Sequence, residues 1–152
     1  MLKEIQFGKH RGKTLPQIVL SDPDWFFWAY EHKAFQGELK VEADEIFRKA
    51  TSIKIPQVDG EEREVEYLIH ADSKKLSGVD AVPKSRPLHS GSSQAFRKPV
   101  FDLSVPRQIS KFDKLGGKMM VKALKIHIFR DPRTKLTKRV CEKFFNDETN
   151  FK

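Results

Sequence analysis

Hydrophobic and polar positions in the first fifty residues predict a turn followed by three helices. A short apolar start and two glycines that bracket a basic tripeptide indicate a hairpin-like turn over residues 5–15, because glycine tolerates the positive φ of tight turns. A proline then favours a short helix over residues 17–20. Asp22-Pro23-Asp24 places a cap, a proline and an acid at the start of a second helix, which is expected to reach about Phe35. A third helix is expected over residues 39–50.

From residue 51 onward the pattern changes to that of strands. Residues 52–58 and 64–70 are expected to pair as a hairpin through a turn at Asp59-Gly60. Residues 73–99 are rich in Ser, Gly and Pro and contain few large apolar side chains, so we expect a flexible loop there. Residues 99–105 alternate between apolar and polar positions, which predicts another strand.

Residues 120–129 fit two periods. Met120, Leu124 and Ile128 suit one face of a helix, whereas Leu124, Ile126 and Ile128 also occupy every second position. The β-branched residues in this stretch favour the interpretation as a strand.

A last helix is expected to begin at Asp131-Pro132, with Leu136, Val140 and Phe144 as its apolar stripe. The fold class that follows is α+β, with a short N-terminal hairpin and two or three helices before a mostly antiparallel sheet and a C-terminal helix. We expect one domain over residues 1–152. Its helical region spans residues 1–50, and its sheet-rich basic region spans residues 51–152.

The second predicted helix carries a run of aromatic residues that one core cannot cover completely. At about 100° per residue, Trp25 and Trp28 share one face, Phe26 lies on another, and Phe27 points away from both. We expect Phe26 and Trp28 to be buried. Phe27 is then the candidate for exposure, where it could stack on an unpaired base or anchor a protein partner.

Composition limits the class of protein. The chain has 152 residues, of which 38% are hydrophobic, and this is enough for the core of one domain. No stretch approaches the roughly 18 apolar residues of a membrane span, and residues 1–4 do not resemble the start of a signal peptide. One cysteine, Cys141, cannot form an internal disulfide or a Cys-rich zinc site. We therefore expect a cytoplasmic protein with no membrane partner.

The net charge of +8 is concentrated in the last third of the chain. Residues 1–50 hold eight basic and eight acidic residues, whereas residues 101–152 hold thirteen basic and six acidic ones. Such a segment is typical of a protein with a polyanionic partner, although a solvated face that aids solubility is the alternative. The candidate phosphate contacts are the basic residues of the Gly8–Gly12 turn region and of this segment: Lys9, His10, Arg11, Lys13, Arg107, Lys111, Lys118, Lys122, Lys125, Arg130, Arg133, Lys135, Lys138 and Arg139.

One motif resembles a known family. It consists of Phe7-Gly8-Lys9-His10-Arg11-Gly12-Lys13-Thr14-Leu15, followed by Asp22-Pro23-Asp24-Trp25-Phe26-Phe27-Trp28. About residues 5–35 are thereby similar to the C-terminal domain of exodeoxyribonuclease X and to a bacterial family described as quorum-sensing-regulated virulence factors. The sequence departs from the family pattern at Trp25, where Tyr is usual, at Phe26, where Leu is usual, and at His10, which occupies an aromatic position. The resemblance implies a role in nucleic-acid metabolism as an accessory to a nuclease, not as the nuclease.

Enzymatic interpretations find little support in the residues. The five histidines lack metal-ligand spacing, and Gly116-Gly117-Lys118 is followed by Met119 instead of the Ser or Thr of a phosphate loop. Asp22 and Asp24 lie on the same predicted helix as Glu31-His32-Lys33, which is unlike the strand-borne acids of a metal-dependent nuclease. Cys141 lacks an identifiable His partner and is expected to be a buried thiol.

We therefore expect a non-catalytic nucleic-acid-binding protein that needs no cofactor and no metal, with DNA favoured over RNA. A free-standing copy of the motif would suit an accessory factor of a phage or mobile element. The alternative is a protein-interaction module that docks on a host replication, repair or transcription enzyme. Its interface would be the aromatic helix and the 73–99 loop.

Overall fold

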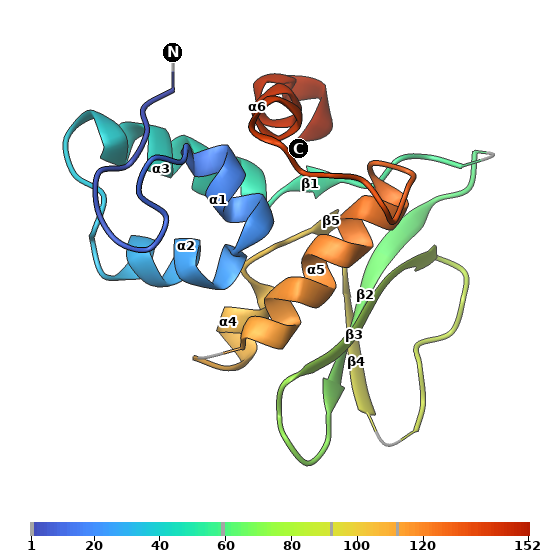
Figure 1. Ribbon diagram of the computed structural model, residues 1–152. Coiled ribbons are helices and arrows are strands. Elements are labelled where there is room, and N and C mark those ends of the chain that lie inside the picture. The colour runs from blue at the N-terminus through green and yellow to red at the C-terminus, as the bar shows by residue number, and fades with distance from the viewer. Residues whose placement is uncertain (1, 59, 92, 112) are drawn as a thin grey trace.

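The computed structural model describes residues 2–58, 60–91, 93–111 and 113–152. The helices are α1 (Leu15–Ser21), α2 (Pro23–Glu31), α3 (Glu38–Ala50), α4 (Val105–Ile109), α5 (Lys114–His127), α6 (Lys138–Asn146) and the 3₁₀-helix η1 (Glu148–Asn150). The strands are β1 (Ile53–Lys54), β2 (Arg63–His70), β3 (Leu76–Pro83), β4 (Ser93–Lys98) and β5 (Val100–Phe101). Figure 1 shows α1, α2 and α3 as a helical group on one side, the sheet of β2, β3 and β4 on the other, and α5 between them.

The α+β class and its antiparallel pairing are confirmed. β2 is the central strand of a three-stranded sheet and pairs antiparallel with both β3 and β4. β1 pairs with β5, not with β2, so the predicted hairpin of residues 52–58 and 64–70 is wrong. Asp59, in the turn proposed for that hairpin, lies outside the described residues. The polar, acid-rich stretch before β2 contains an isolated bridge between Val58 and Glu61.

The first third follows its local signals closely. The hairpin-like turn is closed by hydrogen bonds from Ile5 N to Lys13 O at 3.0 Å and from Gly12 N to Ile5 O at 2.9 Å. Asp22 caps α2 by accepting a hydrogen bond from Trp25 N, and α3 spans almost the predicted residues. α2 ends at Glu31, four residues before the predicted end, because Lys33 adopts the left-handed φ of 56° that terminates the helix.

The expected flexible loop over residues 73–99 is wrong, because β3 and β4 occupy about half of it. Small residues conceal the strand pattern there, yet they suit close packing against β2. A Cβ on Gly78 would lie 3.2 Å from the Leu68 side chain, and Phe96 of β4 stacks on the ring of Tyr67 in β2. The strands thus depend on the central strand they pair with and not on their own composition.

The predicted strand over residues 120–129 is also wrong, since residues 120–127 belong to α5 and Ile128 is its C-cap. Asp113 caps the helix by accepting a hydrogen bond from Gly116 N at 2.8 Å. The buried residues Met120, Ala123 and Leu124 are spaced three and four apart, whereas Ile126 is exposed. The last helix, α6, begins at Lys138 behind the N-cap Thr137, seven residues later than the expected start at Asp131.

One buried cluster includes side chains from both the helical region and the sheet-rich region. Tyr67 of β2 connects them, because its hydroxyl donates to Val100 O at 3.0 Å and accepts from Asp102 N at 2.9 Å. Burial raises the pKa of Tyr67, so the hydroxyl keeps its proton for this contact.

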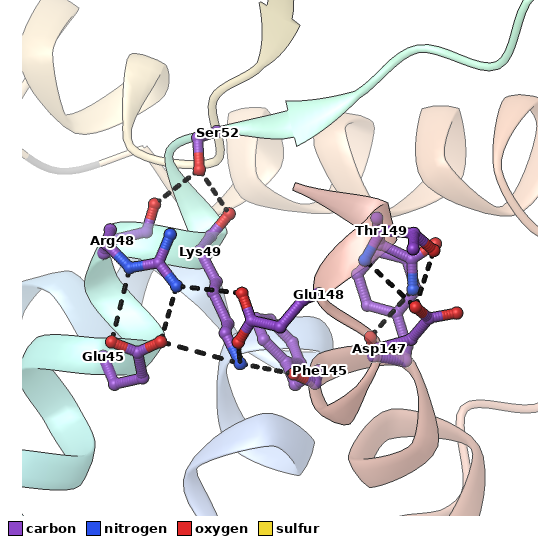
Figure 2. A network of polar contacts seen from close by, with 10 residues as sticks. Glu45, Arg48, Lys49, Ser52, Phe145, Asp147, Glu148 and Thr149 are labelled. Carbon is purple, nitrogen blue, oxygen red and sulfur yellow. Dashed lines mark hydrogen bonds and ion pairs between the residues drawn. The ribbon is translucent and has the colours of Figure 1, made fainter. Parts of the chain in front are cut away.

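A buried lysine holds the end of the chain against α3 (Figure 2). Lys49 donates to Phe145 O at 2.7 Å and pairs with Glu148 at 2.9 Å. Arg48 reaches Glu148 at 3.3 Å from the neighbouring position and also pairs with Glu45. These contacts join the C-terminal end of α6 to the helical group.

Candidate nucleic-acid interface

The exposure of two aromatic residues of α2 is the reverse of the one predicted. Phe27 is only 2% exposed and packs edge-on against Phe47 of α3, whereas Trp28 is 44% exposed. The predictions that Phe27 is exposed and Trp28 is buried are therefore wrong. The helix packs against α1, α4 and α5, and its Phe27 also contacts Phe47 of α3. Trp28 lies outside these contacts and faces solvent, with Trp25 partly buried beside it.

The exposed tryptophan is held in a fixed arrangement. The imidazole ring of His32 stacks on Trp28 with 4.8 Å between ring centroids and 28° between the planes. His32 Nδ1 lies 2.8 Å from Trp28 O, which fixes the imidazole at the end of α2. Trp25 lies beside Trp28, with 6.5 Å between the ring centroids. Trp28 is thus a supported, partly open aromatic surface.

The basic turn packs against the start of α2. Asp22 accepts contacts from Lys9 Nζ and His10 Nε2, each at 3.0 Å. Burial alone would raise the pKa of Asp22, but the contacts from His10 and Lys9 lower it overall. The hydrogen bond to Asp22 in turn raises the pKa of Lys9.

This packing changes the roles of the predicted residues in the turn. A Cβ on Gly8 would lie 3.2 Å from Trp25, so glycine permits the close approach of the turn to α2. His10 is buried edge-on against Trp25, and its Nε2 is engaged by Asp22, so it supports the turn and is not a free cation. Arg11 and Lys13 are exposed and form no ion pair with any other described residue.

The side chain of Arg107 is engaged in contacts within the protein. Its guanidinium pairs with Glu31 at 2.8 Å and Asp24 at 3.3 Å and donates to Lys111 O at 2.7 Å. The side chain is 8% exposed. We therefore assign Arg107 the role of joining α4 to α2, in place of the phosphate contact expected from the sequence.

Two glycines bring the first turn of α5 close to α2 and α4. A Cβ on Gly117 would lie 3.3 Å from Pro23 of α2, and one on Gly116 would lie 2.9 Å from Pro106 of α4 and collide with the Asp113 carboxylate. Gly116-Gly117 thus has a packing role. The close approach places Lys114 and Lys118 beside the basic turn.

Two adjoining grooves result. The tryptophan groove, with a volume of about 570 Å³, is lined by Lys9, Trp25, Trp28, His32, Lys111 and Lys114, with the Asp24–Arg107 pair among them. The lysine groove is lined by His10, Lys13, Asp22, Lys114, Gly117 and Lys118, among others. Lys114 belongs to both grooves. Among the described residues, Lys13, Lys111, Lys114 and Lys118 form no ion pair, so their charges remain available to an anion.

The structure therefore brings Lys9 and Lys13 of the turn together with Lys111 and Lys118 of the basic segment. Lys114 was not among the phosphate contacts predicted from the sequence. The i, i+4 spacing of Lys114, Lys118 and Lys122 would have revealed it had this stretch been interpreted as a helix.

The other predicted basic residues lie elsewhere. Lys122 and Lys125 continue along α5, and Arg130, Arg133 and Lys135 are exposed in the connection to α6. Lys138 and Arg139 line a separate depression on α6 with Lys143. α6 lies far from the first turn of α5 (Figure 1). The basic segment is thus divided between two regions of the surface.

Other kinds of site have less support. No group of three or more His, Cys, Asp or Glu residues that could hold a metal ion occurs in the part of the chain that the structure describes. Cys141 is buried as expected, and burial raises its pKa to about 11, so the thiol stays protonated at neutral pH. None of the helices among residues 2–58, 60–91, 93–111 and 113–152 is long and apolar enough to cross a membrane.

Comparisons with known proteins identify no related protein. No protein-family model matches the chain, and no curated protein or solved structure matches it. The similarity of residues 5–35 to the exodeoxyribonuclease X family therefore remains a resemblance in motif.

Proposed function

We propose that the protein binds nucleic acid at the tryptophan and lysine grooves, with DNA favoured over RNA, and that it does so without catalysing a reaction. The observation that carries the proposal is the exposed Trp28 ring with Lys111 and Lys114 in the same groove. An aromatic surface beside lysines without ion pairs matches the two chemical features of a nucleic acid, its flat bases and its charged backbone.

The charge of the grooves supports a polyanionic ligand. Around the two grooves, Asp22 is engaged by Lys9 and His10, and Asp24 is engaged by Arg107. The charges of Lys13, Lys111, Lys114 and Lys118 are not compensated in this way. A phosphate backbone in the grooves would therefore meet an excess of positive charge, and binding would release condensed counterions.

Binding to a fluorescein-labelled DNA oligonucleotide, measured by anisotropy at 50 and 200 mM salt, tests the proposal. Affinity should fall steeply with salt, and Lys114→Ala should reduce the slope of log K against log[salt] by roughly 0.7 to 0.9, the contribution of one phosphate contact. Trp28→Ala should weaken binding by about 1–3 kcal/mol, which is roughly 5- to 150-fold. Absence of binding at the lower salt concentration would contradict the proposal.

A protein partner is the second candidate, and it is favoured by Leu115, which is 69% exposed on the first turn of α5. A host protein that docked on Leu115 and Trp28 would bind mainly by apolar contact. Its recovery in a pull-down would survive nuclease treatment and depend weakly on salt. Nucleic-acid binding predicts the opposite response to both treatments.

A nuclease activity is not proposed. Incubation of the protein with labelled DNA and magnesium should leave the DNA at full length on a denaturing gel. Progressive shortening of the DNA would contradict the non-catalytic assignment.

A further inference from the structure

The lysines of α5 form one continuous stripe. At about 100° per residue, Lys114, Lys118, Lys122 and Lys125 lie within about 80° of one another around the helix. The buried residues of α5, which include Met120 and Ala123, lie on the opposite side. None of the four lysines forms an ion pair within the described part of the chain, so the stripe presents uncompensated positive charge.

The stripe begins at the two grooves. Lys114 lines both of them, and Lys118 lines the second. With a rise of about 1.5 Å per residue, Lys114, Lys118 and Lys122 follow one another at intervals of about 6 Å along the helix. This spacing is similar to that of successive phosphates in an extended single strand. Lys125 lies about 16 Å along the axis from Lys114, so the stripe can accompany a strand over several nucleotides.

A base stacked on the Trp28 ring would have to be unpaired. Stacking requires access to the flat face of a base, and in a duplex both faces are covered by neighbouring base pairs. His32 already occupies one side of the Trp28 ring and Trp25 lies beside it, yet 44% of Trp28 is exposed and it lines the tryptophan groove. The open part can therefore accept one unpaired base without moving the imidazole.

We propose that the ligand is a single-stranded nucleic acid, with one unpaired base stacked on Trp28 and its backbone following the lysine stripe of α5. The inference rests on the proposed function and adds the strandedness of the ligand and its path. The basic residues of α6 lie outside this path. They therefore provide a control surface with the same kind of charge.

The test compares single-stranded DNA with a duplex of the same sequence by fluorescence anisotropy. The variants are Trp28→Ala and two charge reversals of equal size, Lys118→Glu with Lys122→Glu on α5 and Arg139→Glu with Lys143→Glu on α6. The four reversed side chains are all exposed, so circular dichroism should show native folding in both double variants.

We expect the single strand to bind at least roughly fivefold more tightly than the duplex, which corresponds to the lower end of the energy of one stacked base. Trp28→Ala should remove most of this preference. The α5 reversal should weaken binding at least tenfold more than the α6 reversal. Equal affinity for both forms of DNA would overturn the single-strand inference and leave the proposed function intact. Equal losses from the two reversals would overturn the path along α5, and no binding to either DNA would overturn the proposed function itself.

Discussion

Replacing Phe27 by alanine distinguishes the packing role of this residue from the binding role proposed for its neighbour Trp28. The Phe27 ring is 2% exposed and contacts Phe26 at 5.2 Å and Phe47 at 5.6 Å between centroids. Truncation leaves a cavity between α2 and α3, and a buried Phe→Ala change costs about 3–5 kcal/mol of unfolding free energy. That loss is a large part of the roughly 5–15 kcal/mol that stabilises a typical domain.

Trp28→Ala is the matched control. The Trp28 side chain is 44% exposed, so its removal should lower the unfolding free energy by far less than the loss at Phe27. Urea denaturation followed by circular dichroism measures both variants, and Phe27→Leu provides a folded comparison with a smaller cavity. In binding assays normalised to the folded fraction, Phe27→Leu should retain wild-type affinity for DNA. Equal destabilisation at the two positions, or loss of DNA binding in folded Phe27→Leu, would refute the reasoning.

Three further predictions concern Lys49, Cys141 and Asp22. Lys49→Met removes the contacts to Phe145 and Glu148, and urea denaturation should show a loss of about 1–3 kcal/mol of unfolding free energy. Glu148 is 67% exposed, so Glu148→Gln should lower the unfolding free energy by less than about 1 kcal/mol. Similar losses in the two variants would contradict this account. Cys141 should react with iodoacetamide only after unfolding, because burial raises its pKa to about 11, and rapid labelling of the native protein would argue against it. The pKa of Asp22 is lowered in the folded state. The stability of the wild type relative to Asp22→Asn should therefore be greatest at pH values above the ordinary carboxyl pKa of 3.8 and should shrink as the pH falls below it. A stability difference that does not change with pH would count against the contacts of Asp22 with Lys9 and His10.

Local signals were sufficient for the first third of the fold and insufficient for much of the rest. The cap at Asp22 and the positive φ of Gly8 and Gly12 are properties of a few adjacent residues, and the structure reproduces them. β3 and β4 contain small and polar residues whose strand conformation depends on pairing with β2. The Asp113 cap of α5 is local, three residues before Gly116, and the period of residues 120–129 fitted a helix as well as a strand. The close approach of Gly117 to Pro23, by contrast, joins distant parts of the chain and has no local sign.

The candidate site shows the same division. The helical period correctly places Trp25 and Trp28 on one face of α2, but it cannot tell which face is buried, since that depends on where α1 and α3 pack. Lys9 and Lys13 could be proposed from the glycine turn alone. The pairing of Arg107 with Glu31 and Asp24 joins residues 76 and 83 positions apart and has no local sign in the sequence.

The central claim is that nucleic acid binds at the Trp28 surface and not at the basic face of α6. Photocrosslinking of single-stranded DNA that contains iododeoxyuridine, followed by mass spectrometry of tryptic peptides, tests the claim most directly, because this base reacts with aromatic side chains that stack on it. The account predicts a crosslink at Trp28 that disappears in Trp28→Ala. Crosslinks confined to residues 138–146, with none at Trp28, would contradict it.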